Sequence, residues 1–174
     1  NLAHLARWRF LGGDPTGRRV AVLAGKGGNG GGGLACARRL HNWGAAVAVF
    51  AAVPDEEFQG VPADQISTLQ RMRVPVDGRD GSGDLPPADL VVDALIGYSL
   101  RGAPHGRLAR LIQAADSHGA PVLSLDLPSG LDATTGETPG PVVRATATLT
   151  LALPKSGLRA AHALPYVGEL YLAD

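Results

Sequence analysis

The sequence predicts an α/β fold, because segments typical of buried strands alternate with segments typical of helices along its 174 residues. The predicted strands are short runs of apolar and β-branched residues, and the predicted helices repeat apolar residues every three or four positions. Most of the 24 glycines and 13 prolines stand between these segments, where they mark turns. Strands that alternate with helices form a mainly parallel sheet with helices on both faces.

The beginning of the chain predicts a helix and then a complete strand–helix–strand unit. The elements expected are a helix over 2–11, a strand over 20–24, a glycine-rich loop over 25–33, a helix over 34–43 and a strand over 46–52. The first helix starts abruptly, so we expect it to be truncated. Two strands joined through a helix lie parallel, with a right-handed crossover between them.

The same alternation continues to the end of the chain. The elements expected are a helix over 63–73, a loop over 76–87, a strand over 90–95, a helix over 106–118, a strand over 121–127, a half-exposed strand over 147–153 and a short strand over 169–172. No repeat or linker interrupts the pattern, so we expect one domain over residues 1–174. The fold predicted is a Rossmann-like three-layer sandwich with a mostly parallel sheet.

Composition excludes several classes of partner. The formal net charge is zero and 18% of the residues are charged, which gives no electrostatic reason to expect nucleic acid or a membrane surface. No apolar run approaches the roughly 18 residues of a membrane span. Cys36 is the only cysteine, so no disulfide can form within the chain, and we expect a cytoplasmic protein.

Three loops are expected to meet at one edge of the sheet. They follow predicted strands and cover residues 25–33, 97–106 and 128–136, and each combines glycine with polar side chains. In open parallel sheets, ligands bind outside the carboxyl ends of the strands. This convergence predicts a ligand site before any resemblance is considered.

The first loop contains Gly25-x-Gly27-x-x-Gly30, which has the spacing of the dinucleotide-binding fingerprint. The acidic residue that a conventional NAD-dependent dehydrogenase carries at the end of its second strand is missing, because that strand ends in alanine. The phosphate-binding Gly-Lys-Ser/Thr pattern is also missing. The loop therefore either holds a phosphate-bearing nucleotide against its backbone or only lets the helix pack tightly on the sheet.

Two carboxylates stand at the ends of predicted strands. Asp93 follows the apolar run Leu90-Val91-Val92, and Asp126 precedes a Pro-Ser-Gly turn. A buried carboxylate is costly unless it faces a cleft or a partner, so both are candidates for ligand contact. Together with Asn29 and Ser129 they offer oxygens to a hard cation. The alternative for Asp126 is that it only caps the following turn.

These motifs, taken in order, resemble the YjeF N-terminal domain family of NAD(P)H-hydrate epimerases. The segment over 22–34 is similar to the family's G-P-G-N-N-G-G-D-G-L loop, and the segment over 92–102 to its D-A-L-F-G-T-G-L segment. Asp126-Leu127-Pro128-Ser129-Gly130-Leu131-Asp132 resembles its D-I-P-S-G-L-D segment, and Pro154-Lys155-Ser156-Gly157-Leu158 its P-K-x-G-L turn. The resemblance covers roughly residues 5–174, without the family's usual N-terminal helix.

The resemblance implies a Rossmann-like enzyme that interconverts the C6 epimers of hydrated NADH and NADPH (NADHX and NADPHX), with a bound potassium ion. It implies that Asn29, Asp93 and Ser129 hold the ion and that Asp126 is the acid–base group facing the nicotinamide ring. The ligand-binding residues that it implies are Gly28, Asn29, Gly30, Gly31, Gly32, Gly97, Tyr98, Ser99, Leu100, Arg101, Gly102, Ala103 and Asp126. It also implies a homodimer and a partner dehydratase on a separate chain.

One departure from the family pattern separates two functional predictions. Gly28 replaces one asparagine of the family loop, and Gly32 replaces its aspartate, which is expected to bind the ligand. The change predicts reduced or altered epimerase activity, or a catalytically silent nucleotide-binding or protein-interaction module of the same fold. The intact segment that begins at Asp126 favours the enzyme.

Two further side chains near the predicted site remain open. Lys155 either meets a phosphate of the ligand or is an exposed lysine in a turn, and Tyr98 either stacks on a ring or covers the sheet edge. The five histidines show no metal-binding spacing, and Cys36 is expected to be a small buried residue rather than a nucleophile.

Overall fold

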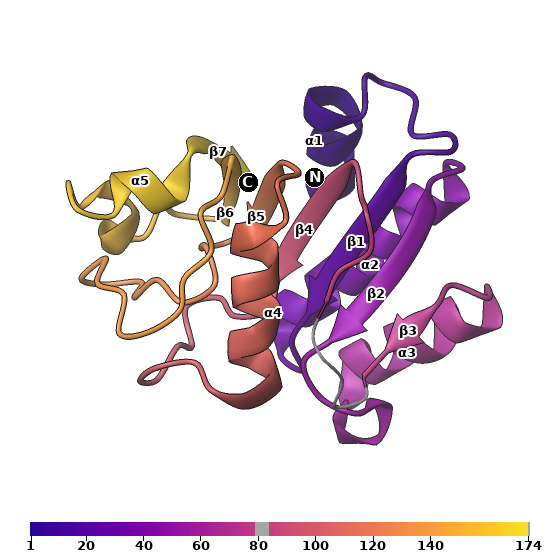
Figure 1. Ribbon diagram of the computed structural model, residues 1–174, viewed down its shortest axis with the longest axis horizontal. Coiled ribbons are helices and arrows are strands. Elements are labelled where there is room, and N and C mark those ends of the chain that lie inside the picture. The colour runs from indigo at the N-terminus through magenta and orange to yellow at the C-terminus, as the bar shows by residue number, and fades with distance from the viewer. Residues whose placement is uncertain (79–83, 174) are drawn as a thin grey trace.

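The computed structural model describes residues 1–78 and 84–173, and the seven strands in these residues form one parallel sheet (Figure 1). Their order across the sheet is β3-β2-β1-β4-β5-β6-β7, and every neighbouring pair is parallel. The strands are β1 (Arg19–Ala24), β2 (Ala46–Ala51), β3 (Val76–Asp77), β4 (Leu90–Ala94), β5 (Val122–Leu125), β6 (Ala147–Leu151) and β7 (Glu169–Ala173).

Helices cover both faces of the sheet, which confirms the predicted α/β sandwich (Figure 1). On one face, α1, α2 and α3 pack against alternate residues of β1, β2 and β4; on the other, α4 packs against the remaining residues of β1 and β4. The helical segments are α1 (Leu2–Leu5), η1 (Ala6–Phe10), α2 (Gly28–Asn42), η2 (Asp55–Glu57), α3 (Gly60–Arg71), α4 (Gly106–Ser117), η3 (Ser156–Arg159) and α5 (Leu164–Val167). Among the described residues, no helix is long and apolar enough to cross a membrane.

The chain reverses its direction of winding between β1 and β4. From β1 it proceeds outward through β2 to β3, and it then returns to β4 and proceeds through β5 and β6 to β7. Such a reversal leaves a crevice at the carboxyl ends of the two central strands, because the connections leave β1 and β4 on opposite sides. The fold therefore directs the loops after β1, β4 and β5 to one edge of the sheet.

Helix α2 begins six residues earlier than the sequence predicted, so the prediction of a loop over 25–33 and a helix over 34–43 was wrong at this boundary. Glycine disfavours helices, yet here its missing side chain is required by packing. A Cβ on Gly30 would collide with the backbone of Gly25, and a Cβ on Gly33 would collide with Ala94 of β4. Tight packing against the sheet thus overrides helix propensity, and only Gly25–Gly27 remains as loop.

The strand predicted over 147–153 is confirmed over Ala147–Leu151, but the prediction that it is half-exposed was wrong. Strand β6 lies between β5 and β7, and both Thr148 and Thr150 are fully buried. Thr148 Oγ1 donates to the carbonyl of Val167 at 2.7 Å, which satisfies its hydroxyl inside the protein. The threonines that alternate with apolar residues in this strand are therefore buried, and their hydroxyl groups form hydrogen bonds inside the protein instead of facing solvent.

The loop predicted over 76–87 was wrong at its start, where Val76 and Asp77 form the short edge strand β3. Two residues give too weak a pattern for a strand to be predicted from sequence. Residues 79–83 of that predicted loop lie outside the described part of the chain.

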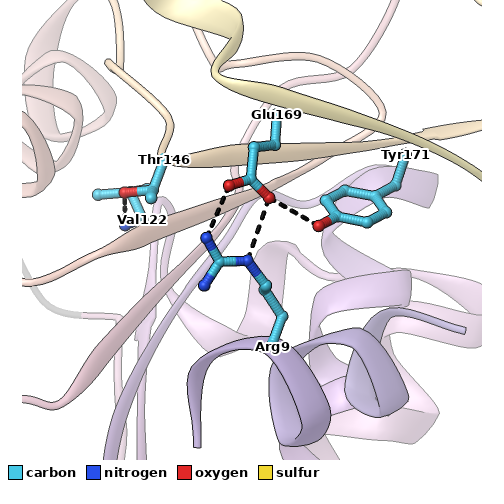
Figure 2. Close-up of polar contacts among 5 residues, drawn as sticks. All are labelled: Arg9, Val122, Thr146, Glu169 and Tyr171. Carbon is cyan, nitrogen blue, oxygen red and sulfur yellow. Dashed lines mark hydrogen bonds and ion pairs between the residues drawn. The ribbon is translucent and has the colours of Figure 1, made fainter.

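A clamp of three side chains joins the N-terminal helical segment to the last strand (Figure 2). Arg9 donates from Nη2 to Glu169 Oε1 at 2.6 Å and from Nε to Oε2 at 3.1 Å, and the Tyr171 hydroxyl donates to Oε2 at 2.7 Å. The hydrogen bond from the Arg9 guanidinium, followed by that from Tyr171, lowers the pKa of Glu169 from 4.5 to about 2.

This pKa shift predicts how the clamp depends on pH. Because the pKa of Glu169 is lower in the folded state, its stabilisation is complete above about pH 4.5 and is lost as the pH falls towards about 2. We expect Glu169→Gln to lower the melting temperature near neutral pH and to match the parent protein near pH 2. Calorimetry or circular dichroism at a series of pH values measures the difference.

The exposed residue Glu56 provides the control, because Glu56→Gln removes a carboxylate outside the clamp. A melting-temperature difference for Glu169→Gln that stays constant across the acidic range would contradict the prediction.

Candidate functional site

A cleft of about 840 Å³ lies at the carboxyl ends of the strands. Its walls come from the loops after β1, β2, β4 and β5, from the end of β6 and from the first turn of α4. This volume falls within the range of pockets that hold small molecules and cofactors. Three cationic side chains, Lys26, Arg101 and Arg107, lie among the lining residues, which suits a ligand that carries phosphate.

Most residues predicted from the sequence to bind the ligand line this cleft. Those that do are Gly28, Asn29, Gly32, Gly97, Tyr98, Ser99, Leu100, Arg101, Gly102, Ala103 and Asp126. Gly30 and Gly31 do not, because they lie in α2 against the backbone of Gly25 and the ring of Pro62. Asp93 and Ser129 lie outside the cleft lining, where they bond to each other.

Asp126 occupies the position immediately after β5, and its backbone has a positive φ of 69°. This left-handed conformation is uncommon for a residue with a side chain and costs about 1–2 kcal/mol. The residue is only 3% exposed, yet it lines the cleft. Strained backbone at a buried, charged residue on a cleft wall is characteristic of functional positions.

The two carboxylate oxygens of Asp126 have different surroundings. Oδ1 accepts a hydrogen bond from the backbone N–H of Leu151 at 3.3 Å and contacts the ammonium group of Lys155. Oδ2 lies beside Gly97, where a Cβ would be only 3.2 Å away, and no described residue donates to it. One oxygen is therefore held by the protein, and the other is left for the cleft.

Asn29 approaches Gly97 from the first turn of α2. A Cβ on Gly97 would lie 3.4 Å from Asn29 Oδ1 as well as 3.2 Å from Asp126 Oδ2. Glycine at this position thus lets an amide from the loop after β1 and a carboxylate from the loop after β5 reach the same point. The Nδ2 atom of Asn29 is buried and has no partner within the described residues.

Asp93 is fully buried at the end of β4 and accepts hydrogen bonds from two serines. Ser124 Oγ donates at 2.8 Å, Ser129 donates from Oγ at 2.6 Å and from its backbone N–H at 2.8 Å, and Leu95 N–H adds a longer bond of 3.3 Å. Burial raises the pKa of Asp93, and these hydrogen bonds oppose the rise. The carboxylate therefore joins β4, β5 and the loop after β5 beneath the cleft.

Sequence reasoning missed the partner of Asp126. Lys155 was predicted to meet a phosphate or to be exposed, whereas its ammonium group pairs with Asp126 and its side chain is 21% exposed. The signal that could have indicated it is the parallel pairing of β5 with β6, in which Leu125 lies opposite Leu149. That register brings the residues after β6 next to the residue after β5.

Arg107 was also missed, since a single arginine in a helix carries no signal. It is buried near the start of α4, where Nε donates to the carbonyl of Ala51 at 2.7 Å and Nη2 to the carbonyl of Asp77 at 3.0 Å. It therefore fastens the first turn of α4 to the ends of β2 and β3 and keeps one wall of the cleft in place.

A doubly wound parallel sheet with a glycine-lined, cation-bearing cleft at the ends of its central strands defines a protein of the Rossmann-like class. The particular family follows from comparison of the sequence with known families. The chain belongs to the family described as YjeF-related protein N-terminus, whose model matches residues 1–157.

Curated relatives of the chain carry enzyme names. It is 47% identical to an NAD(P)H-hydrate epimerase of Dehalogenimonas lykanthroporepellens, over 100% of this chain and 68% of that protein, and 42% identical to one of Truepera radiovictrix, over 89% and 68%. It is 37% identical to a bifunctional NAD(P)H-hydrate repair enzyme of Escherichia coli, over 90% of this chain and 30% of that enzyme. The chain thus spans about two thirds of the epimerases and about a third of the bifunctional enzyme.

A solved structure supports the same fold. The crystal structure of the yeast protein ynu0 matches with a TM-score of 0.75 and 26% sequence identity, covering 91% of this chain and 71% of the yeast chain.

The close packing of α2 gives a prediction for two glycines. Ala at position 30 would force its Cβ into the backbone of Gly25, whereas Ala at position 28 would meet no atom within 4 Å. We expect Gly30→Ala to destabilise the protein by about 2–3 kcal/mol and Gly28→Ala to change stability by less than about 0.5 kcal/mol. Urea unfolding measures both, and equal effects of the two changes would contradict the packing argument.

Proposed function

We propose that this chain interconverts the R and S epimers of hydrated NADH and NADPH at C6, as a repair reaction on damaged nicotinamide nucleotides. The observation that carries the proposal is the placement of Asp126 Oδ2, which faces the cleft and to which no described residue donates. The names of the relatives support the same reaction, because each curated relative described above is an epimerase or repair enzyme. The alternative of a silent module gains no support from these relatives.

The reaction needs one proton to move in each direction. In the hydrate, C6 carries a hydroxyl group and is bonded to ring nitrogen N1. Protonation of the hydroxyl lets water leave while the N1 lone pair forms a C=N bond, giving a planar iminium. Water that adds to the opposite face and gives up a proton produces the other epimer. A single carboxyl group serves as the acid in the first step and as the base in the second.

The residues of the cleft divide the remaining work. Asp126 donates the proton through Oδ2 and takes one back from the incoming water. Asn29 Oδ1 and Asp126 Oδ2 both lie beside Gly97, so the Asn29 amide is close enough to orient the ring or the water. The loop from Gly97 to Ala103 and the side chain of Arg101 hold the phosphates, which fixes the ligand far from the reacting carbon.

Gly32 changes how the ligand is held. It stands where the family usually has aspartate, and it lies on the wall of the cleft. A Cβ there would be 2.6 Å from Leu125 Cδ2, so the leucine side chain occupies the space beside the backbone. The proposal therefore includes altered or reduced affinity, with Asn29 and the loop after β4 supplying the contacts that the aspartate would make.

We propose that a potassium ion binds next to this site, held by Asn29, Asp93 and Ser129. The donor set suits a hard cation, because it offers carboxylate, amide and hydroxyl oxygens. The buried carboxylate of Asp93 faces only hydrogen-bond donors and no described cationic side chain. The described residues contain no group of three His, Cys, Asp or Glu that could hold a metal, and the set proposed here instead mixes carboxylate, amide and hydroxyl side chains. When bound, the ion would offset the charge of Asp93 and fix the Asn29 amide.

The partners and compartment are proposals of the same kind. The bifunctional relatives support the proposal of a dehydratase that acts on one epimer, either fused to the chain or separate from it. We propose a homodimer and a cytoplasmic location, in keeping with the family resemblance and with a single buried cysteine.

The proposed acid–base role of Asp126 predicts that Asp126→Asn lowers the rate of epimer exchange by at least about 10²-fold. The amide cannot give or take the proton at the pH of the assay. Incubating the protein with one purified NADHX epimer and following the other by chromatography measures the rate.

Asp116→Asn is the matched control, because Asp116 pairs with Arg144 at the other end of α4 and does not line the cleft. We expect it to change the rate by less than twofold. An unchanged rate in a folded Asp126→Asn protein would show that another group moves the proton.

The proposed ion predicts stabilisation by potassium. We expect a higher melting temperature and a faster reaction in potassium chloride than in tetramethylammonium chloride, since a ligand at about 100 times its Kd stabilises a protein by about 2.7 kcal/mol. Asn29→Ala should abolish the difference while leaving the fold intact, because Nδ2 has no described partner to lose. Equal melting temperatures and rates in both salts would refute the ion site.

A further inference from the structure

Lys155 directs its ammonium group at three acceptors around the end of β6. Nζ contacts Asp126 Oδ1, donates to the carbonyl of Leu151 at 2.9 Å and lies 3.5 Å from Thr150 Oγ1. An ammonium group has three protons, so each acceptor corresponds to one donor. The side chain of Lys155 is thereby fixed in position, although it belongs to a turn between elements.

The pair that it forms with Asp126 is mostly out of water. The side chains of Lys155 and Asp126 are 21% and 4% exposed. By contrast Lys26, the other lysine of the chain, is 61% exposed and stands 3.6 Å from Glu57. Removing one member of a buried pair leaves an uncompensated charge, whereas an exposed pair contributes little. Of the two lysine ion pairs, the Lys155–Asp126 pair is therefore the one whose loss should destabilise the folded state.

The pairing with Lys155 gives the two carboxylate oxygens of Asp126 different roles: one contacts the protein, and the other faces the cleft. Both the Lys155 ammonium and the Leu151 N–H act on Oδ1, and Oδ2 is left facing Gly97 and the cleft. The last torsion of an aspartate side chain is broad, so the plane of an unrestrained carboxylate would rotate freely. Here the contacts from Lys155 and Leu151 hold that plane, so that one oxygen stays directed at the cleft.

We infer that Lys155 is a positioning residue for the acid–base group, an inference that rests on the proposed epimerisation. It holds Oδ1 so that proton transfer runs through Oδ2 alone, and its charge faces the carboxylate that forms when Asp126 has protonated the leaving hydroxyl. The step starts from the protonated form of Asp126: the proton moves from Oδ2 to the C6 hydroxyl oxygen, the C6–O bond breaks with its electron pair on water, and the iminium and the Asp126 carboxylate remain. The returning water gives its proton back to Oδ2, so Lys155 neither gains nor loses one.

The test separates binding from turnover. We expect Lys155→Met to lower kcat for NADHX epimerisation by about 10–10²-fold, the cost of a misplaced catalytic group, while KM changes by less than about threefold. Lys155→Arg keeps a cationic donor at this position and should recover part of kcat. Arg159→Met is the matched control, since Arg159 is an exposed cation of the adjoining η3 with no contact to Asp126, and it should leave kcat within twofold.

Folding and local charge are followed in the same set of variants. Lys155→Met should lower the melting temperature because it leaves the buried carboxylate unpaired, and the added change Asp126→Asn should recover part of that loss. For Lys155→Ala, methylamine or ethylamine in the assay should raise kcat by supplying the missing cation, whereas the parent protein should not respond.

The outcomes distinguish the two proposals. A parent protein that does not exchange the epimers overturns the proposed function, and the role of Lys155 in it falls as well. An active parent with unchanged kcat in a folded Lys155→Met protein overturns only the positioning role. A raised KM at constant kcat would also overturn it, because it would make Lys155 a residue that binds the ligand.

Discussion

The site depends on the hydrogen bonds that the buried carboxylate of Asp93 accepts from Ser124 and Ser129. The carboxylate is fully enclosed, and moving a charge out of water costs several kcal/mol unless donors replace the solvent. Ser124 in β5 and Ser129 in the following loop supply those donors. If either strand shifted along the other, the Asp93 carboxylate would lose these hydrogen-bond donors. The register of β4 and β5 is therefore fixed where the cleft begins.

Ser129 links the Asp93 carboxylate to the loop after β4 and to the loop after β5. Its hydroxyl donates to Asp93 and accepts a hydrogen bond from the backbone N–H of Ile96 at 2.9 Å. Ile96 immediately precedes Gly97, and Ser129 lies three residues after Asp126. One hydroxyl thus sets the separation between the loop after β4 and the loop after β5, which is the separation between Gly97 and Asp126 Oδ2.

The features that could be predicted are those that leave a pattern within a short segment of the sequence. The strands and their parallel orientation were predictable because buried β-branched runs and the helices between them repeat along the chain. Asp126 and Asn29 were predictable as cleft residues because each stands where a strand or its loop ends. The start of α2 was not, since the need for glycine at position 30 comes from a backbone contact that only the packed fold reveals.

Lys155 and Arg107 were missed for a related reason. Their partners lie 29 and 56 residues away in sequence, and a single cation in a turn or helix has the same pattern whether it faces water or a buried oxygen. Only the order of strands across the sheet brings β6 beside β5, and α4 beside the ends of β2 and β3. Chemistry-bearing residues at strand ends are therefore visible from sequence, while the residues that hold them in place are not.

The backbone conformation of Asp126 explains why its Oδ2 atom faces the cleft. Its left-handed backbone turns the chain out of β5, and its N–H still bonds to the carbonyl of Leu149 at 2.8 Å. The buried charge is met from one side by Lys155 and Leu151, which satisfies Oδ1 and leaves Oδ2 without a described donor. A fold selected for stability alone would place an apolar residue here and relax the backbone. Backbone strain, a buried ion pair and an acceptor with no described donor together support the proposal that Oδ2 meets a ligand.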